Sequence, residues 1–233
     1  MRLLKLKAYQ LLANYRKPMS YNFWDTYPLP PFSAVKGWFH RVVDATDYIP
    51  ISICIQGKPG SVVYDLQTLI KFDRLRSEKA QTVIDGFNKA LSKSPTFIAN
   101  IFDIDLNIYL LSDNVYMRKF MENIFEKEFP HLGRYEDIIR IDSVNLIDVK
   151  EKEFSMFVDE HKIDYGIYLK KETANKLNIE GINYRMNFKY EIIDGVRYFS
   201  KVDIVYTDNA IINTGKFLFD SEDERIIELI GDL

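Results

Sequence analysis

The chain has 233 residues, of which 47% are hydrophobic and 28% are charged, and its formal net charge is −3 at pH 7. That length suffices for one large domain or two small ones, and the composition is that of an ordinary globular protein. The single cysteine, Cys54, excludes an internal disulfide, and no apolar run of about 18 residues predicts a membrane span. We therefore expect a cytoplasmic protein without a membrane partner.

Charge is unevenly distributed along the chain. Residues 1–43 carry seven cations and one carboxylate, a net charge of +6, whereas residues 201–233 carry three cations and eight carboxylates, a net charge of −5. The overall charge of −3 does not by itself indicate nucleic-acid binding, but a basic front half favours one face for a polyanion. A solvated surface of mixed charge is the equally weighted alternative.

The first predicted element is a half-buried strand over residues 2–9, in which apolar residues alternate with lysines. A mixed segment follows, and in it Tyr15 directly precedes Arg16 and Lys17. A ring beside two cations in a loop is a candidate contact to an RNA base and a phosphate. An exposed basic turn is the alternative.

A stiff, extended approach over residues 27–31 precedes the first predicted helix, because its prolines cannot donate to a helix or a ladder. Ser33 is the predicted N-cap. The exposed face of this helix is expected to carry Lys36, Gly37 and His40. Glycine inside a helix costs about 1 kcal/mol relative to alanine, so we expect a packed strand or a ligand to approach the backbone at Gly37. The predicted buried stripe is Val35, Trp38, Phe39, Val42 and Val43.

The middle of the chain alternates between apolar runs and turn residues. Gly133 permits a bend that other residues cannot make, and Arg134 and Tyr135 follow it directly. A cation and a stacking ring on one turn form a second candidate RNA contact. The other elements expected here are strands over 49–56, 61–72, 97–111 and 139–149, a tight turn at 57–60, and helices over 77–93 and after the N-cap Asp113.

The order of these elements predicts an α+β fold. Residues 1–147 are expected to form a ferredoxin-like, RRM-like domain, and residues 148–233 a smaller β-rich C-terminal module. Two alternating strands around Asp194-Gly195 predict a two-residue hairpin. The remaining elements expected in this module are strands over 165–170 and 210–219, a helix over 172–177, and a helix over 226–230 preceded by a capping box of Ser221 and Glu224.

Catalytic constellations are scarce in this sequence. The three histidines, His40, His131 and His161, lie in different segments, so no metal site is predicted and no cofactor is expected. Metal-independent RNA cleavage needs a base, an acid and a cation. His40 with Lys36 one helical turn away, or His161, would supply some of these groups, and surface positions without a catalytic role are the alternative.

Two motifs in a fixed order carry a resemblance to a known family. The segment Tyr27-Pro28-Leu29-Pro30-Pro31 with Ser33, Val35 and Gly37, followed by Leu132-Gly133-Arg134-x-Glu136-Asp137 and Arg140-Ile141, resembles a CRISPR-associated RAMP protein. Within that family it is similar to the type I Cascade subunit that caps the 5′ handle of CRISPR RNA. Phe32, between Pro31 and Ser33, departs from the expected pattern and blurs the subtype.

The resemblance implies an RRM-like RAMP domain plus a β-rich part, and assembly in antiviral defence with CRISPR RNA, a backbone RAMP subunit and a large subunit. It implies that most members bind RNA without cutting it. One branch cleaves precursor RNA with a tyrosine, a lysine and a histidine, and that triad cannot be placed here, because His161-Lys162 has reversed order and lies in the second module.

Three functions therefore stand at the level of sequence. The first is a non-catalytic subunit that holds the 5′ handle of CRISPR RNA. The alternatives are a metal-independent endoribonuclease built on His40, Lys36 or His161, and a protein-interaction scaffold without direct RNA contact. The residues predicted to bind RNA are Tyr15, Arg16, Lys17, Lys36, His40, Gly133, Arg134 and Tyr135.

Overall fold

The computed structural model describes residues 1–74, 82–83, 89–127, 130–155 and 160–233. Its central elements are β1 (Arg2–Ala13), α1 (Phe32–Val42), β3 (Ser52–Arg74), β5 (Lys89–Leu111), α2 (Asn114–Asn123) and β6 (Arg140–Asp148). The four strands pair antiparallel in the order β3-β5-β1-β6, with one helix after β1 and the other after β5. This is the predicted ferredoxin-like arrangement, so the α+β fold class is confirmed.

Helix α1 packs as its spacing predicts, with Val35, Phe39 and Val42 buried and the rings of Trp38 and Phe39 against Phe120 of α2. Its start differs from the prediction. The N-cap is Pro31, Ser33 lies inside the first turn, and no side chain caps the helix. Proline suits this position because its fixed φ and missing N–H leave the backbone extended up to the first helical residue.

One expectation for the exposed face of α1 is wrong, and of the two explanations expected for Gly37 the packed strand is excluded. Lys36 is only 8% exposed, because the hairpin of β10 (Ile182–Ile193) and β11 (Val196–Thr207) lies over that part of the helix. No described strand packs on Gly37: a Cβ built there would meet no atom within 4 Å apart from its own stretch of helix backbone.

Strand β3 runs straight through residues 57–60, where the sequence predicts a turn. Gly57 serves close packing instead, since a Cβ there would lie 2.8 Å from the carbonyl oxygen of Asp105. Pro59 is tolerated because, beyond Gly57, no described strand pairs with the second edge of β3.

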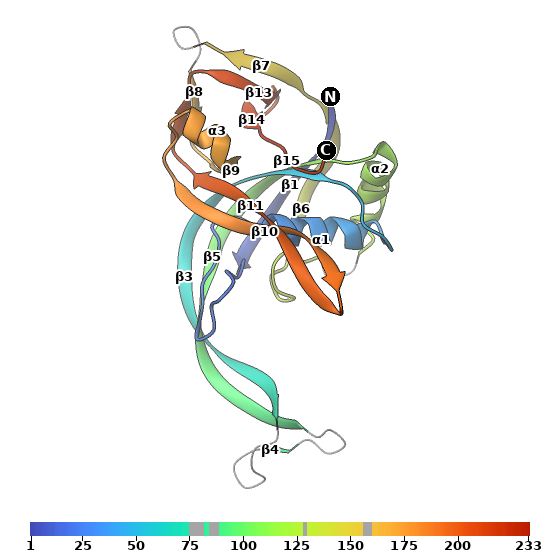
Figure 1. The fold of residues 1–233 in the computed structure, drawn as a ribbon, viewed down its shortest axis with the longest axis vertical. Coiled ribbons are helices and arrows are strands. Elements are labelled where there is room, and N and C mark those ends of the chain that lie inside the picture. The colour runs from blue at the N-terminus through green and yellow to red at the C-terminus, as the bar shows by residue number, and fades with distance from the viewer. Residues whose placement is uncertain (75–81, 84–88, 128–129, 156–159) are drawn as a thin grey trace.

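The outer halves of β3 and β5 form a long two-stranded arm that leaves the body of the molecule (Figure 1). The predicted helix over 77–93 is wrong wherever the structure describes it: β4 (Thr82–Val83) and the first residues of β5 are strand and pair with each other. The rest of that predicted helix lies outside the described residues. Short β2 (Phe23–Trp24) pairs with the other edge of β5 near the root of the arm.

The last third of the chain extends the same sheet in the order β10-β11-β9-β3. Its hairpin turns at Asp194 and Gly195, with φ of 50° and 76°, as the sequence predicts. The predicted helix over 226–230 is wrong, because this segment pairs with strands and Ser221–Glu224 forms a turn. The elements here are β7 (Lys150–Phe154), β8 (His161–Ile163), β9 (Gly166–Lys170), α3 (Lys171–Lys176), β10 (Ile182–Ile193), β11 (Val196–Thr207), β12 (Ala210–Ile212), β13 (Gly215–Asp220), β14 (Arg225–Ile227) and β15 (Ile230–Gly231).

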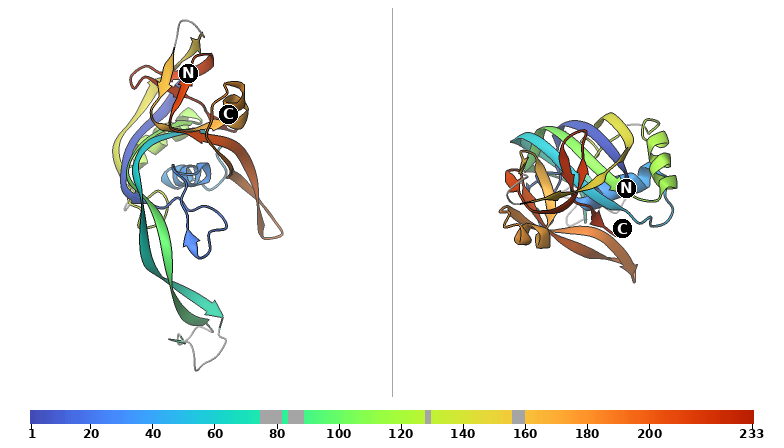
Figure 2. Two further views of the ribbon diagram at one scale, coloured as in Figure 1. Left: turned by 90° about the vertical axis from the view of Figure 1, so that its left-hand side faces the viewer. Right: turned by 90° about the horizontal axis from the view of Figure 1, so that it is seen from above.

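Within the body of the molecule, other elements pack on both faces of the central sheet. α1 and α2 cover one face, and the small sheet β14-β13-β7 covers part of the other (Figure 2). Cys54 lies in the hydrophobic cluster between the central sheet and the small sheet, where burial raises the pKa of its thiol to about 12. No helix among the described residues has the length and apolar character needed to span a membrane.

Candidate nucleic-acid interface

The turn after Pro130 is built around Gly133 and Asp137. Gly133 has φ of +112°, and a Cβ there would lie 2.6 Å from the Asp137 carboxylate, so glycine is required. Arg134 binds the same carboxylate, with 2.7 Å between its Nη2 and Oδ1 of Asp137 and 3.0 Å to Oδ1 of Asn100. Its side chain is 14% exposed. Arg134 therefore holds this turn against β5 rather than extending into solvent.

Tyr15 belongs to the same buried network. It is 1% exposed and donates its hydroxyl to Oε1 of Gln10 at 2.6 Å. Gln10 in turn donates to the carbonyl oxygens of Leu132 and Asp137 at 2.9 Å. The expectation of an exposed ring at Tyr15 is wrong, because this hydrogen bond draws it inside. The network leaves Tyr135 outside, with 71% of its surface exposed.

Arg16 and Lys17 lie at the surface beside Tyr15. The Arg16 guanidinium stands 4.1 Å from the Trp24 ring, and the Lys17 ammonium lies 2.8 Å from the Asp25 carboxylate. Arg16 is exposed and Lys17 half-buried. Nη2 of Arg16 donates to the carbonyl oxygen of Ser20 at 2.5 Å, and stacking on indole leaves the remaining guanidinium donors for a phosphate.

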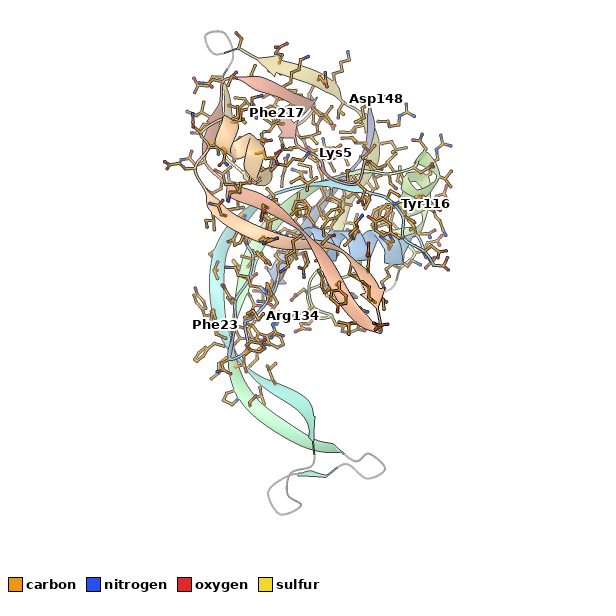
Figure 3. The ribbon with its side chains drawn as sticks, viewed as in Figure 1. Lys5, Phe23, Tyr116, Arg134, Asp148 and Phe217 are labelled. Atoms are coloured by element: carbon orange, nitrogen blue, oxygen red, sulfur yellow. The ribbon has the colours of Figure 1, made fainter. Side chains whose placement is uncertain are left out.

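Exposed rings gather where the arm leaves the body, a region we name the arm root: Phe23, Tyr64 and Phe97, with exposures of 39%, 65% and 54%. β2 and β3 flank β5, and the rings of Phe23 and Tyr64 meet across it with centroids 5.9 Å apart. Figure 3 shows Phe23 and Arg134 at this level of the molecule. Sequence reasoning missed these rings. Their signal is aromatic residues at outward positions of three neighbouring strands, β2, β5 and β3.

A hollow lies between α1 and the β10–β11 hairpin. It is a cavity of about 580 Å³ whose walls include Lys36, Gly37, Tyr48 and Phe188. A smaller cavity of about 260 Å³ lies beside it and is lined by residues that include Arg16, Lys17, Tyr27 and Met186. Ser33 lines both, so the two adjoin. We name these two adjoining cavities the seam. Four of the residues predicted to bind RNA, Arg16, Lys17, Lys36 and His40, line it.

His40 is held by both nitrogens of its ring. Its Nε2 accepts from the backbone N–H of Ile49 at 2.9 Å, which leaves Nδ1 to donate to the carbonyl oxygen of Lys36 at 2.8 Å. Burial lowers the pKa of His40. A neutral imidazole with both nitrogens engaged is poorly placed to move a proton on a substrate.

His161 lies in a different part of the molecule. It stands on β8 beside the rings of Phe154 and Phe219 and lines another cavity, of about 520 Å³. Burial lowers the pKa of this histidine too. The structure therefore brings Lys36 and His40 together but not His161. The described residues contain no group of three His, Cys, Asp or Glu that could hold a metal ion.

Comparison with known proteins gives a likeness in fold. No protein-family model and no curated protein sequence matches the chain. A solved chain described as "CRISPR RNA-guided surveillance complex" superposes with a TM-score of 0.58 at 12% identity, covering 90% of each chain. A chain described as "Crystal structure of Cas protein" superposes with a TM-score of 0.47 at 12% identity, covering 91% of this chain and 95% of the other. A CRISPR protein from Archaeoglobus fulgidus superposes with a TM-score of 0.46 at 12% identity, covering 97% of this chain and 98% of the other. The chain therefore has the fold of a chain found in a CRISPR RNA-guided surveillance complex.

Proposed function

We propose that the chain is a non-catalytic, RNA-binding subunit of a type I CRISPR effector complex, and that it holds the 5′ handle of the CRISPR RNA in antiviral defence. The observation that carries this proposal is the shared fold, which covers 90% of this chain and 90% of a chain from a CRISPR RNA-guided surveillance complex. The two sequence motifs point to the same family.

The surface supplies the chemistry that single-stranded RNA requires. Exposed rings at the arm root offer faces on which bases stack, and Arg16 and Lys17 stand beside them for phosphates. Tyr135 adds a ring on the turn that Arg134 fixes in place. In this account Arg134 and Tyr15 position the interface and do not touch RNA.

The arm supports assembly with protein partners. As a two-stranded ribbon it has no core of its own, and it exposes Val62, Leu66 and Ile70 by 45%, 58% and 60%. Apolar surface on such a ribbon is stabilised when a partner covers it. We assign this role to the backbone RAMP subunit, with the large subunit as a further neighbour in the complex.

The nuclease alternative finds less support in the geometry. Lys36 and His40 share one helix, but both nitrogens of the His40 ring are committed to backbone partners. His161 faces a separate cavity. The walls of that cavity also include Lys152, Asp164 and Glu224, so the nuclease alternative rests on His161 and not on His40.

Binding of labelled single-stranded repeat RNA across a salt series tests the proposal. We expect the double substitution Arg16→Ala with Lys17→Ala to weaken binding and to reduce the slope of log affinity against log salt by roughly 1 to 1.5, since each lost phosphate contact on a single strand removes about 0.7. Lys150→Ala, an exposed cation on β7, is the matched control. An unchanged slope in the double variant would place the RNA elsewhere on the surface.

A further inference from the structure

The cavity between α1 and the β10–β11 hairpin contains a buried cation without a counter-ion. Lys36 is 8% exposed, and its ammonium lies 4.5 Å from the centre of the Phe188 ring and 5.1 Å from that of Tyr48. It forms no ion pair with any residue in the described part of the chain. Asp232, whose charge acts on Lys36, is taken by Lys189 at 3.2 Å and by the Tyr48 hydroxyl.

A desolvated ammonium of this kind is costly unless an anion reaches it. Burial lowers the pKa of Lys36 to about 8, although Asp232 acts in the opposite direction. The rings around the ammonium stabilise the cation, but they leave its hydrogen-bond donors unused. The cavity therefore offers an unfilled place for an anionic group.

Gly37 lines the same cavity and is the second observation. It occupies a helix interior, where glycine costs about 1 kcal/mol relative to alanine. A Cβ there would meet no atom within 4 Å apart from its own stretch of helix backbone, so packing against other elements does not require glycine. The space above Gly37 belongs to the cavity, which the walls leave open.

The remaining walls are suited to a flat, polar-edged ring. Phe188, Tyr190 and Phe199 line the cavity together with Tyr48, and Asp47 and Ser33 add groups that can accept or donate hydrogen bonds. A volume of about 580 Å³ falls within the range of small-ligand sites. Aromatic walls with a buried ammonium match a base joined to a phosphate better than either group alone.

We propose that this cavity binds one unstacked nucleotide, with its base against the aromatic walls beside Gly37 and its phosphate at Lys36. The inference rests on the proposed RNA-binding function and deepens it by assigning a nucleotide site to this seam. The adjoining smaller cavity, lined by Arg16 and Lys17, extends the seam toward the arm root. It gives the neighbouring nucleotides of the RNA a basic surface to follow.

Titration of the whole chain with adenosine 5′-monophosphate, adenosine and inorganic phosphate, followed by saturation-transfer NMR, tests the site. We expect the monophosphate to bind at least about tenfold more tightly than the nucleoside, and phosphate alone to bind most weakly. Lys36→Met should abolish this preference, because it keeps most of the unbranched side chain and removes the charged ammonium. Lys150→Met on β7 should change nothing.

Gly37→Leu gives the sharpest variant, since it fills the cavity without removing any contact. We expect it to melt at the wild-type temperature or above, to lose detectable binding of the monophosphate and to bind single-stranded RNA about tenfold more weakly. Monophosphate binding that survives in a folded Gly37→Leu protein would overturn the site.

Three further outcomes separate the site from the function it rests on. If RNA binds the wild type but the monophosphate does not, the nucleotide site is wrong and the proposed function stands. If an acidic aromatic peptide displaces the monophosphate at lower concentration than RNA does, the cavity belongs to a protein partner and the nucleotide assignment fails. If the chain binds no RNA at all, the proposed function fails as well.

Discussion

At the scale of single residues, Lys5 shows how a covered strand face changes the role of a cation. Alternation in β1 predicts a solvent-facing Lys5, yet this side chain is 2% exposed. The end of β13 and the turn after it lie over Lys5 and supply three carboxylates, from Asp220 at 2.6 Å, Glu222 at 2.8 Å and Asp223 at 2.9 Å. The strand was predictable from alternation, but this partner lies more than 200 residues away, so local sequence holds no signal for it.

We predict that Lys5→Met lowers the free energy of unfolding by about 3 kcal/mol, because it leaves the buried carboxylate of Asp220 without its cation. Urea denaturation measures the loss. The double variant Lys5→Met with Asp220→Asn should recover part of it, whereas Lys162→Met, at an exposed lysine, serves as control. A Lys5→Met protein as stable as the wild type would contradict this account of the cluster.

Acid should loosen the same cluster. Burial opposes ionisation of Asp223, but hydrogen bonds from Lys7 and Lys5 prevail and hold the pKa of its carboxyl below the ordinary 3.8. A depressed carboxyl pKa contributes stability above the unfolded-state value and loses it as the pH falls through the folded-state value. Unfolding midpoints measured below pH 4 should therefore fall more steeply in the wild type than in Lys5→Met with Lys7→Met. Parallel curves would argue against the pairing.

Arg134 lies on the turn that the sequence predicts, but it contacts other residues of the chain where an RNA contact was predicted. The Gly133 turn is confirmed by its φ of +112°, but the guanidinium faces inward. We predict that Arg134→Ala destabilises the fold by about 3 kcal/mol, since Asp137 is 1% exposed and would remain as an unpaired buried charge. A double-mutant cycle with Asp137→Asn measures the coupling. In RNA binding, the salt slope of Arg134→Ala should match the wild type, and a slope reduced by about 0.7 would mean that Arg134 contacts a phosphate after all.

At the scale of elements, periodicity identified the parts whose patterns are local. The α1 stripe, the Asp113 cap of α2 and the Asp194-Gly195 hairpin each depend on neighbours within one or two turns, and all three are confirmed. The predicted turn at 57–60 is wrong, because its glycines serve close contact with β5, a partner distant in the chain. The helix predicted from apolar spacing over 77–93 is wrong for a similar reason, because residues 89–93 pair with β3.

The arm root carries a prediction at this scale. Tyr64→Ala and Phe97→Ala should each weaken binding of single-stranded RNA about tenfold, because one stacked base is worth about 1–3 kcal/mol. Neither should lower the melting temperature much, since the two rings are 65% and 54% exposed. Gel-shift titration measures the affinity. Wild-type affinity in the double variant would remove the arm root from the interface.

At the scale of the whole molecule, the late strands complete a sheet that the first half begins. β9 and β15 both pair with β3, so residues from the last third lie beside residues from the first quarter. The division into parts at residues 147 and 148 stays a prediction. The seam between α1 and β10 could not be predicted, because it exists only once the hairpin is placed against the helix. Gly37 is the one indication of this seam in the sequence, because it is a glycine inside a predicted helix where no turn requires it.

The central claim is that this chain binds CRISPR RNA and leaves it intact. The most direct test is incubation of the purified chain with labelled repeat RNA in chelator, analysed on one native and one denaturing gel. We predict a shifted band on the native gel, full-length RNA on the denaturing gel, and a shift that weakens as salt rises. A discrete cut within the repeat, lost in His40→Ala or His161→Ala, would show a metal-independent nuclease, and no shift at low salt would leave only the scaffold; either result contradicts the account.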